Sequence, residues 1–135
     1  MVYLDTNILI YASVEQNPQK KERSIELLDT LISQKQLVLS TLTLQEFAFT
    51  MAKLGLDHEV IRQDCDFYFA YVSVESDYSI MQEAIGLCCE QNFCKNINDV
   101  MHLLLAQKEK CKKLMSYDRD FKRLSAVCDV EIEVL

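Results

Sequence analysis

A short apolar run that stops at a carboxylate most constrains the fold of this chain. Residues 2–4 are typical of a buried strand, and Asp5 follows them directly. Thr6 and Asn7 then suit the start of a helix, whose apolar pattern continues over residues 8–12. We therefore expect Asp5 at the carboxyl end of a strand, where ligands bind in open α/β sheets. A simple helix-capping role for Asp5 is the alternative.

The rest of the chain alternates between short apolar runs and helical patterns. Strands are expected at residues 37–39, 71–74, 113–116 and 130–134, and helices at 19–33, 43–54, 57–70, 76–88, 96–109 and 119–124. Thr43, Asp57 and Ser76 are the expected helix caps. Strands separated by helices pair in parallel and are covered on both faces. The sequence therefore predicts an α/β fold, a three-layer α/β/α sandwich around a mainly parallel sheet of about five strands.

Composition narrows the class of protein. The 135 residues are half hydrophobic and include only two Gly and one Pro, so a single domain over residues 1–135 is expected. The net charge of −7 argues against charge-driven binding of nucleic acid by the whole surface. No signal peptide and no membrane-spanning window are recognisable, so a cytoplasmic protein is expected. The six cysteines lack metal-site spacing and are expected to be reduced thiols in the core.

Acidic residues recur where strands end or helices begin. Each has a local explanation: Glu46 has capping-box spacing, Asp99 suits a helix N-terminus, and Asp118 and Asp120 suit a turn. A parallel sheet, however, brings its strand ends to one edge, so these acids should lie close to Asp5. Carboxylates crowded there repel one another, and a hard divalent cation is the usual remedy.

Four segments carry a resemblance to a known family. Residues 5–9 (DTNIL), 44–47 (LQEF), 98–106 (NDVMHLLLA) and 115–121 (MSYDRDF) resemble the four motifs of PIN-domain nucleases. The resemblance runs essentially end to end and is greatest with the small toxins of VapBC-type toxin–antitoxin pairs. The chain departs from the pattern at residues 110–112, where many relatives have Gly or Asn, and at Ser116, where Thr is commoner. Neither departure removes a carboxylate.

The resemblance implies a ribonuclease that depends on Mg²⁺ or Mn²⁺. Asp5, Glu46, Asp99 and Asp118 match the catalytic acidic quartet, and Asp120 matches a frequent additional acid. Asp5 and Asp99 are the main expected metal ligands. Glu46, Asp118 and Asp120 are expected to hold metal-bound water or a second ion.

Further residues are candidates for supporting roles. Asn7 and Ser116 are expected to orient the metal ligands. His102 lies one turn beyond Asp99 and could face the site, but a packed or rim position is the favoured expectation.

Basic residues cluster late in the chain, at Lys108, Lys110, Lys112, Lys113, Arg119, Lys122 and Arg123. Lys112, Arg119 and Lys122 are the expected RNA contacts, in a local stripe beside the acidic pocket. A solvated helix face is an equally good explanation for these charges.

The resemblance also implies partners. An antitoxin is expected to lie along the helical pair 43–54 and 57–70. Phe67, Tyr68 and Phe69 span about 200° of a helix, so at least one ring should be exposed or covered by a partner. A homodimer is expected.

Two other classes of protein share some of these features. A response-regulator receiver is disfavoured because the expected third and fifth strands lack its Asp and Lys. A catalytically silent PIN-fold scaffold or RNA-binding protein is the better alternative.

Overall fold

A computed structural model describes all 135 residues of the chain. Its elements are β1 (Val2–Leu4), α1 (Thr6–Ser13), α2 (Pro18–Ser33), β2 (Leu37–Ser40), α3 (Thr41–Lys53), α4 (His58–Phe69), β3 (Val72–Val74), α5 (Tyr78–Gln91), η1 (Cys94–Asn96), α6 (Ile97–Lys108), β4 (Lys113–Ser116), η2 (Arg119–Leu124) and β5 (Glu131–Val134). The five strands form one parallel sheet in the order β3-β2-β1-β4-β5. The predicted α/β fold class is confirmed.

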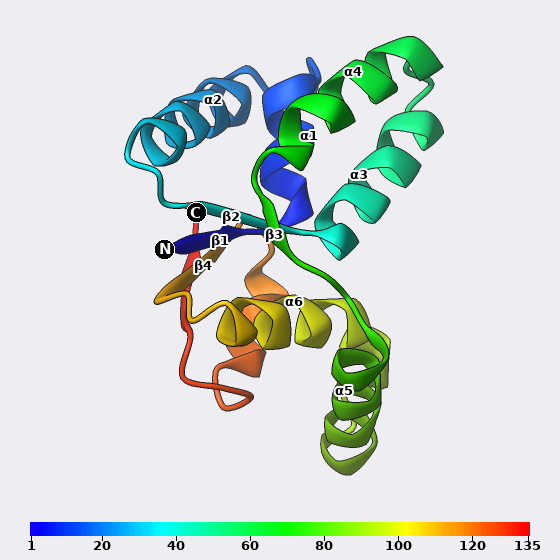
Figure 1. The fold of residues 1–135 in the computed structure, drawn as a ribbon, viewed down its shortest axis with the longest axis vertical. Helices are drawn as coiled ribbons and strands as arrows, with labels where there is room; N and C mark the ends of the chain where they lie inside the picture. The colour runs from blue at the N-terminus through cyan, green and yellow to red at the C-terminus, as the bar shows by residue number, and fades with distance from the viewer.

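Helices cover both faces of this sheet. Helices α1 to α4 lie on one side and α5 and α6 on the other (Figure 1). Because side chains alternate along a strand, β1 contributes Leu4 to the first layer and Tyr3 to the second. None of the helices combines the length and the apolar character that crossing a membrane requires.

The helix caps differ from two of those predicted. Ser40, the last residue of β2, caps α3: it accepts a hydrogen bond from the Thr43 amide at 3.1 Å, while the Thr43 hydroxyl accepts from the Ser40 amide at 3.4 Å. The helix therefore begins before Thr43, and Glu46 lies too far along it to complete a capping box. Likewise Asp77, not Ser76, caps α5. Asp57 caps α4 as expected.

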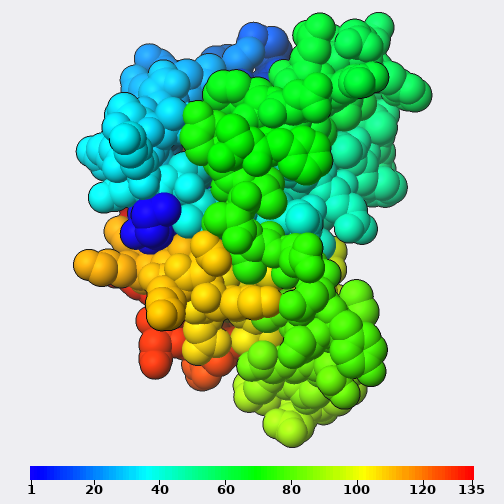
Figure 2. Space-filling model, in the orientation of Figure 1, coloured from blue at the N-terminus to red at the C-terminus, as the bar shows by residue number.

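The helical hairpin of α3 and α4 turns at Gly55, whose positive φ of 83° is a conformation that glycine adopts without strain. On α4, Tyr68 is buried against Phe47, whereas Phe67 and Phe69 are 55% and 56% exposed. The expectation of at least one exposed ring is confirmed. In Figure 2 the green surface of α4 and β3 lies on the face toward the viewer.

The cysteines follow the expectation only in part. All six are free thiols, and Cys88 and Cys111 are buried. Cys89 and Cys94 are instead exposed, with their sulfur atoms 3.9 Å apart, so the prediction of core packing is wrong for this pair. They lie near the end of α5 and at the start of η1, where the chain turns at the surface.

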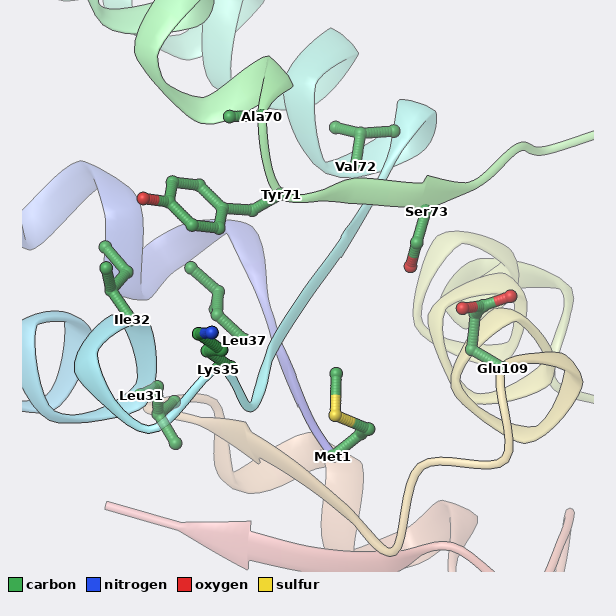
Figure 3. Close-up of a pocket in the computed structure, with 10 residues that line it drawn as sticks. All are labelled: Met1, Leu31, Ile32, Lys35, Leu37, Ala70, Tyr71, Val72, Ser73 and Glu109. Atoms are coloured by element: carbon green, nitrogen blue, oxygen red, sulfur yellow. The ribbon is translucent and has the colours of Figure 1, made fainter.

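The amino-terminal edge of the sheet carries a mainly apolar pocket of about 280 Å³ (Figure 3). Met1, Leu37 and Val72 line it, at or before the starts of three neighbouring strands, and Lys35 and Glu109 are its charged residues. This pocket lies at the opposite edge from the strand ends that carry the predicted acidic site.

Candidate active site

The carboxyl edge of the sheet gathers the acidic side chains. Asp5 follows β1, Asp118 follows β4, Glu46 comes from α3 and Asp99 from the first turn of α6. A pocket of about 270 Å³ opens beside two of these acids and is lined by Asp5, Thr6, Asn7, Ile10, Tyr11, Gln16, Glu46 and Thr50. Four elements that are distant in sequence therefore contribute to one acidic region.

The two carboxylate oxygens of Asp5 make different hydrogen bonds. Its Oδ1 accepts a hydrogen bond from the Thr6 amide at 2.8 Å and so caps α1, while its Oδ2 accepts one from the Ser116 hydroxyl at 2.6 Å. Burial raises the pKa of Asp5 above its ordinary value, although His102 and the Ser116 hydrogen bond act in the opposite direction. The capping alternative is therefore correct, and it does not exclude a site role, because Asp5 also lines the acidic pocket.

Ser116 and Asn7 form a hydrogen-bond network next to Asp5. The Ser116 hydroxyl oxygen accepts hydrogen bonds from the Asn7 amide group at 3.1 Å and from the Asp118 backbone amide at 2.9 Å. One buried hydroxyl thus connects the ends of β1 and β4. These contacts are those that an orienting role requires, and that role stays a prediction.

Glu46 is held at both oxygens. Its Oε1 accepts hydrogen bonds from the Thr6 hydroxyl at 2.8 Å and from His102 Nε2 at 2.5 Å, and its Oε2 accepts one from Asn98 at 3.1 Å. Burial alone raises the pKa of Glu46, but the hydrogen bond and charge of His102, with the other two donors, lower it below its ordinary value. Glu46 is therefore kept as a carboxylate.

His102 is both packed and directed at the site. Only 1% of its surface is exposed, its Nε2 lies 3.7 Å from Asp5 Oδ1, and its Nδ1 lies 2.7 Å from the Tyr3 hydroxyl. Burial lowers the pKa of His102, but Tyr3 and the carboxylates of Glu46 and Asp5 together raise it well above its ordinary value. The sequence suggested two alternatives for His102, a packed position or a position facing the site. In the structure His102 is packed and also faces the site.

Asp99 is an acid whose pKa is raised by burial and by neighbouring carboxylates. Burial, then the charge of Asp5 and to a smaller extent that of Asp118, raise its pKa to about 6, while a hydrogen bond from Asn96 and the charge of His102 oppose the change. The Asn96 contact is long, at 3.4 Å. The hydrogen bond from Asn96 and the charge of His102 therefore do not fully offset the burial and repulsion that disfavour ionised Asp99.

The remaining predicted residues lie on both sides of β4 along the chain. Asp118 caps η2 by accepting a hydrogen bond from the amide of Asp120, whose side chain is exposed. Arg119 and Lys122 also lie on η2, beyond the carboxyl end of β4. Lys112, in contrast, precedes β4 and so lies at the opposite edge of the sheet. It cannot belong to a basic stripe beside the acidic pocket.

The donor atoms suit a divalent cation. Asp5, Glu46 and His102 each offer one ligand atom, and these atoms lie within 4.8 Å of one another. Carboxylate oxygens are the ligands that Mg²⁺ and Mn²⁺ prefer, and an imidazole nitrogen is compatible with Mn²⁺. The crowding around Asp99 provides a further reason for positive charge to bind there.

Comparisons with known proteins give a family and a fold. The family model described as PIN domain matches residues 2–127. Among solved structures, the chain is similar to VapBC2 from Rickettsia felis bound to a DNA fragment from its promoter, at 17% identity and a TM-score of 0.65, over 100% of this chain and 99% of that chain. It is also similar to FitAcB from Neisseria gonorrhoeae, at 19% identity and a TM-score of 0.66, over 98% and 96% of the two chains.

No curated protein matches the chain. The family match nevertheless covers far more than half of the residues, and it includes all four of the segments on which the resemblance was based. This protein therefore belongs to the PIN domain family.

Proposed function

We propose that this protein is a ribonuclease that hydrolyses RNA phosphodiester bonds with the help of Mg²⁺ or Mn²⁺. The observation that supports this most is the crowding at Asp99, whose pKa of about 6 reflects burial beside Asp5 and near Asp118. Carboxyl groups whose pKa is raised by burial and by neighbouring charges are concentrated at functional sites. Asp5, Glu46, Asp99 and Asp118 are the proposed catalytic acids.

The proposed metal ligands are Asp5, Asp99, Asp118 and Asp120. A bound divalent cation would neutralise the negative phosphodiester and favour attack by water. The protein's own groups then set the geometry: Ser116 fixes one oxygen of Asp5, and three donors fix the carboxylate of Glu46. Arg119 and Lys122, exposed beside this edge, are proposed to contact neighbouring RNA phosphates.

We further propose that the protein is the toxin of a toxin–antitoxin pair, acting in the cytoplasm as a single domain and as a homodimer. The likeness to the VapBC2 and FitAcB structures supports this partner class. So do Phe67 and Phe69, which leave the α3–α4 hairpin with exposed aromatic surface of the kind that a partner helix covers. Sedimentation of the protein, alone and with the product of a small adjacent reading frame, tests both associations.

A catalytically silent scaffold remains the second candidate, and one observation favours it. His102 lies against Glu46 and close to Asp5, so an internal cation can satisfy two of the four acids without a metal. Metal binding separates the two functions, because a silent scaffold needs no ion.

The decisive experiment measures cleavage of a defined RNA panel after EDTA treatment and after return of Mg²⁺ or Mn²⁺. We expect cleavage only with the ion, and a loss of about 100-fold or more in Asp5→Asn, since metal assistance contributes several kcal/mol. Asp29→Asn, on an exposed position of α2, makes the same charge change away from the site and should leave cleavage intact. Cleavage in EDTA, or equal rates in both variants, would contradict the proposal.

A further inference from the structure

His102 faces the carboxylates of Glu46 and Asp5 with one ring nitrogen, and packing does not explain this contact. We propose that Nε2 of His102 is a direct ligand of the divalent ion, alongside Asp5 and Glu46, and that this mixed nitrogen–oxygen site selects Mn²⁺ over Mg²⁺. The inference rests on the proposed metal-dependent function and goes beyond it, because it adds His102 and Glu46 to the ligands proposed above and specifies the ion.

The distances are close to those that a shared ion requires. Ligands about 2.1 Å from a six-coordinate ion lie about 3.0 Å apart when adjacent. Nε2 of His102 lies 2.5 Å from Glu46 Oε1 and 3.7 Å from Asp5 Oδ1, on either side of that value. The Glu46 side chain is 26% exposed and can move outward by about 0.5 Å to reach the ligand separation. His102, fully packed, does not need to move.

The other ring nitrogen is held as a metal-bound histidine requires. Such a histidine usually donates its second N–H to a fixed acceptor, which sets the tautomer and the ring orientation. Nδ1 lies 2.7 Å from the hydroxyl of Tyr3, and that hydroxyl has Ser40 Oγ at 2.6 Å as a further partner. In the metal-free protein Nε2 carries a proton and donates it to Glu46. A bound ion takes the place of this proton, and with Nδ1 donating to Tyr3 and Tyr3 donating to Ser40 the lone pair on Nε2 is directed at the ion.

Two neighbouring strands of the sheet hold the groups that support this tautomer. Tyr3 lies on the central strand β1, and Ser40 ends the neighbouring strand β2 and caps α3. Both are completely buried, and no buried side-chain polar atom in the structure lacks a partner. The orientation of His102 is therefore determined by the sheet itself, and not by a mobile loop.

Ligand chemistry then decides the ion. Mg²⁺ prefers oxygen ligands and retains its waters, whereas imidazole binds Mn²⁺ and, more tightly, the later divalent metals. A site with one nitrogen among its ligands should thus bind Mn²⁺ and Co²⁺ better than Mg²⁺. A site made only of the carboxylates would show a smaller preference.

Pulsed EPR of bound Mn²⁺ tests the ligand directly in the unaltered protein. The chain has only two histidines, so protein grown with ¹⁵N-labelled histidine reports on His102 and His58 alone. We expect a coupling from a directly bound nitrogen whose pattern changes with the label. The coupling should persist in His58→Gln, because His58 is exposed on the first turn of α4, and disappear in His102→Gln.

Affinity gives a second, independent measurement. Titration of free Mn²⁺ by EPR, with Mg²⁺ as a competitor, should show that His102→Gln weakens Mn²⁺ binding about tenfold or more and Mg²⁺ binding less. His58→Gln should change neither affinity. Circular dichroism of each variant confirms that it is folded.

Three results would overturn the inference, and they differ in scope. Mn²⁺ that binds the wild-type protein in an Asp5-dependent way but without nitrogen coupling would remove His102 from the ligand set and leave the ribonuclease proposal intact. Failure of Mn²⁺ to bind the wild-type protein, with RNA cleavage still supported by Mg²⁺, would overturn the inference alone. Failure of both ions to bind and to support cleavage would contradict both proposals.

Discussion

Replacement of Asp99 by Asn should make the metal-free protein more stable. The pKa of Asp99 in the folded protein is about 6, against an ordinary value of 3.8, because of burial and the charges of Asp5 and Asp118. A difference of this size corresponds to about 3 kcal/mol of unfavourable free energy for the ionised form. Solvent screening of a partly exposed group removes about half of it.

A second effect of the substitution acts in the opposite direction. Asp99 lies in the first turn of α6, where a negative charge is favourable by about 0.5 kcal/mol. The net gain for Asp99→Asn at pH 7 is therefore about 1 kcal/mol, or about 3–5 °C in Tm for a chain of this length. The isosteric amide can still accept the hydrogen bond that Asn96 donates.

The pH dependence identifies the cause. The folded state binds the Asp99 proton more tightly than the unfolded chain does, so wild-type stability is lost as pH rises from about 4 to about 6. The advantage of Asp99→Asn should be small at pH 4, grow through this window and be constant above pH 7. Thermal and urea unfolding in EDTA, followed by circular dichroism, measure it, with Asp29→Asn as the charge-matched control.

Three results would refute this reasoning. A variant that is less stable at pH 7 would show that the charge at the start of α6 dominates. An advantage independent of pH would show that titration of Asp99 is not its source. Saturating Mn²⁺ should stabilise the wild-type protein more than Asp99→Asn, and equal stabilisation would contradict the proposed ligand role.

Five further substitutions test three separate parts of the structure. Ser40→Ala should lower the free energy of unfolding by about 1–2 kcal/mol in urea titrations, because it removes the cap of α3 and leaves buried partners unsatisfied. Phe67→Ser and Phe69→Ser should each change monomer stability by less than about 0.5 kcal/mol but weaken self-association or antitoxin binding in sedimentation experiments. Lys112→Ala should leave RNA affinity unchanged in filter-binding titrations, whereas Arg119→Ala should weaken it and reduce its salt dependence.

Local patterns were sufficient to predict much of the fold. The boundaries of β4 and η2 agree with the predicted ranges 113–116 and 119–124, because an apolar strand between charged residues leaves little choice of ends. Asp57 was recognisable as a cap from the glycine turn before it. The cap at Ser40 was not predicted, because Ser40 is both the last residue of β2 and the N-cap of α3. The sequence pattern assigned it to neither element.

The site required information that local patterns do not contain. Lys112 and Arg119 are close in sequence, but β4 lies between them, and four strand residues span about 13 Å. The partners of His102 were also out of reach, because Tyr3 lies 99 residues away along the chain. Strand alternation does direct Tyr3 away from Leu4, toward the layer that contains α6, and this was the one signal in the sequence that could have paired them.

The central position of β1 also determines when the acidic pocket can form during synthesis. Val2 pairs with Leu37 of β2 on one side and with Lys113 of β4 on the other. The first strand to be synthesised therefore cannot complete its pairing until β4 has been synthesised. At about 5–20 residues per second, the ribosome delivers β4 on the order of 10 s after β1. Until then β1 has an unpaired edge of the kind that invites aggregation, and Asp118 has not been made. Contacts between strands so distant in sequence form slowly, which separates the translation of the first strand from the assembly of the acidic pocket.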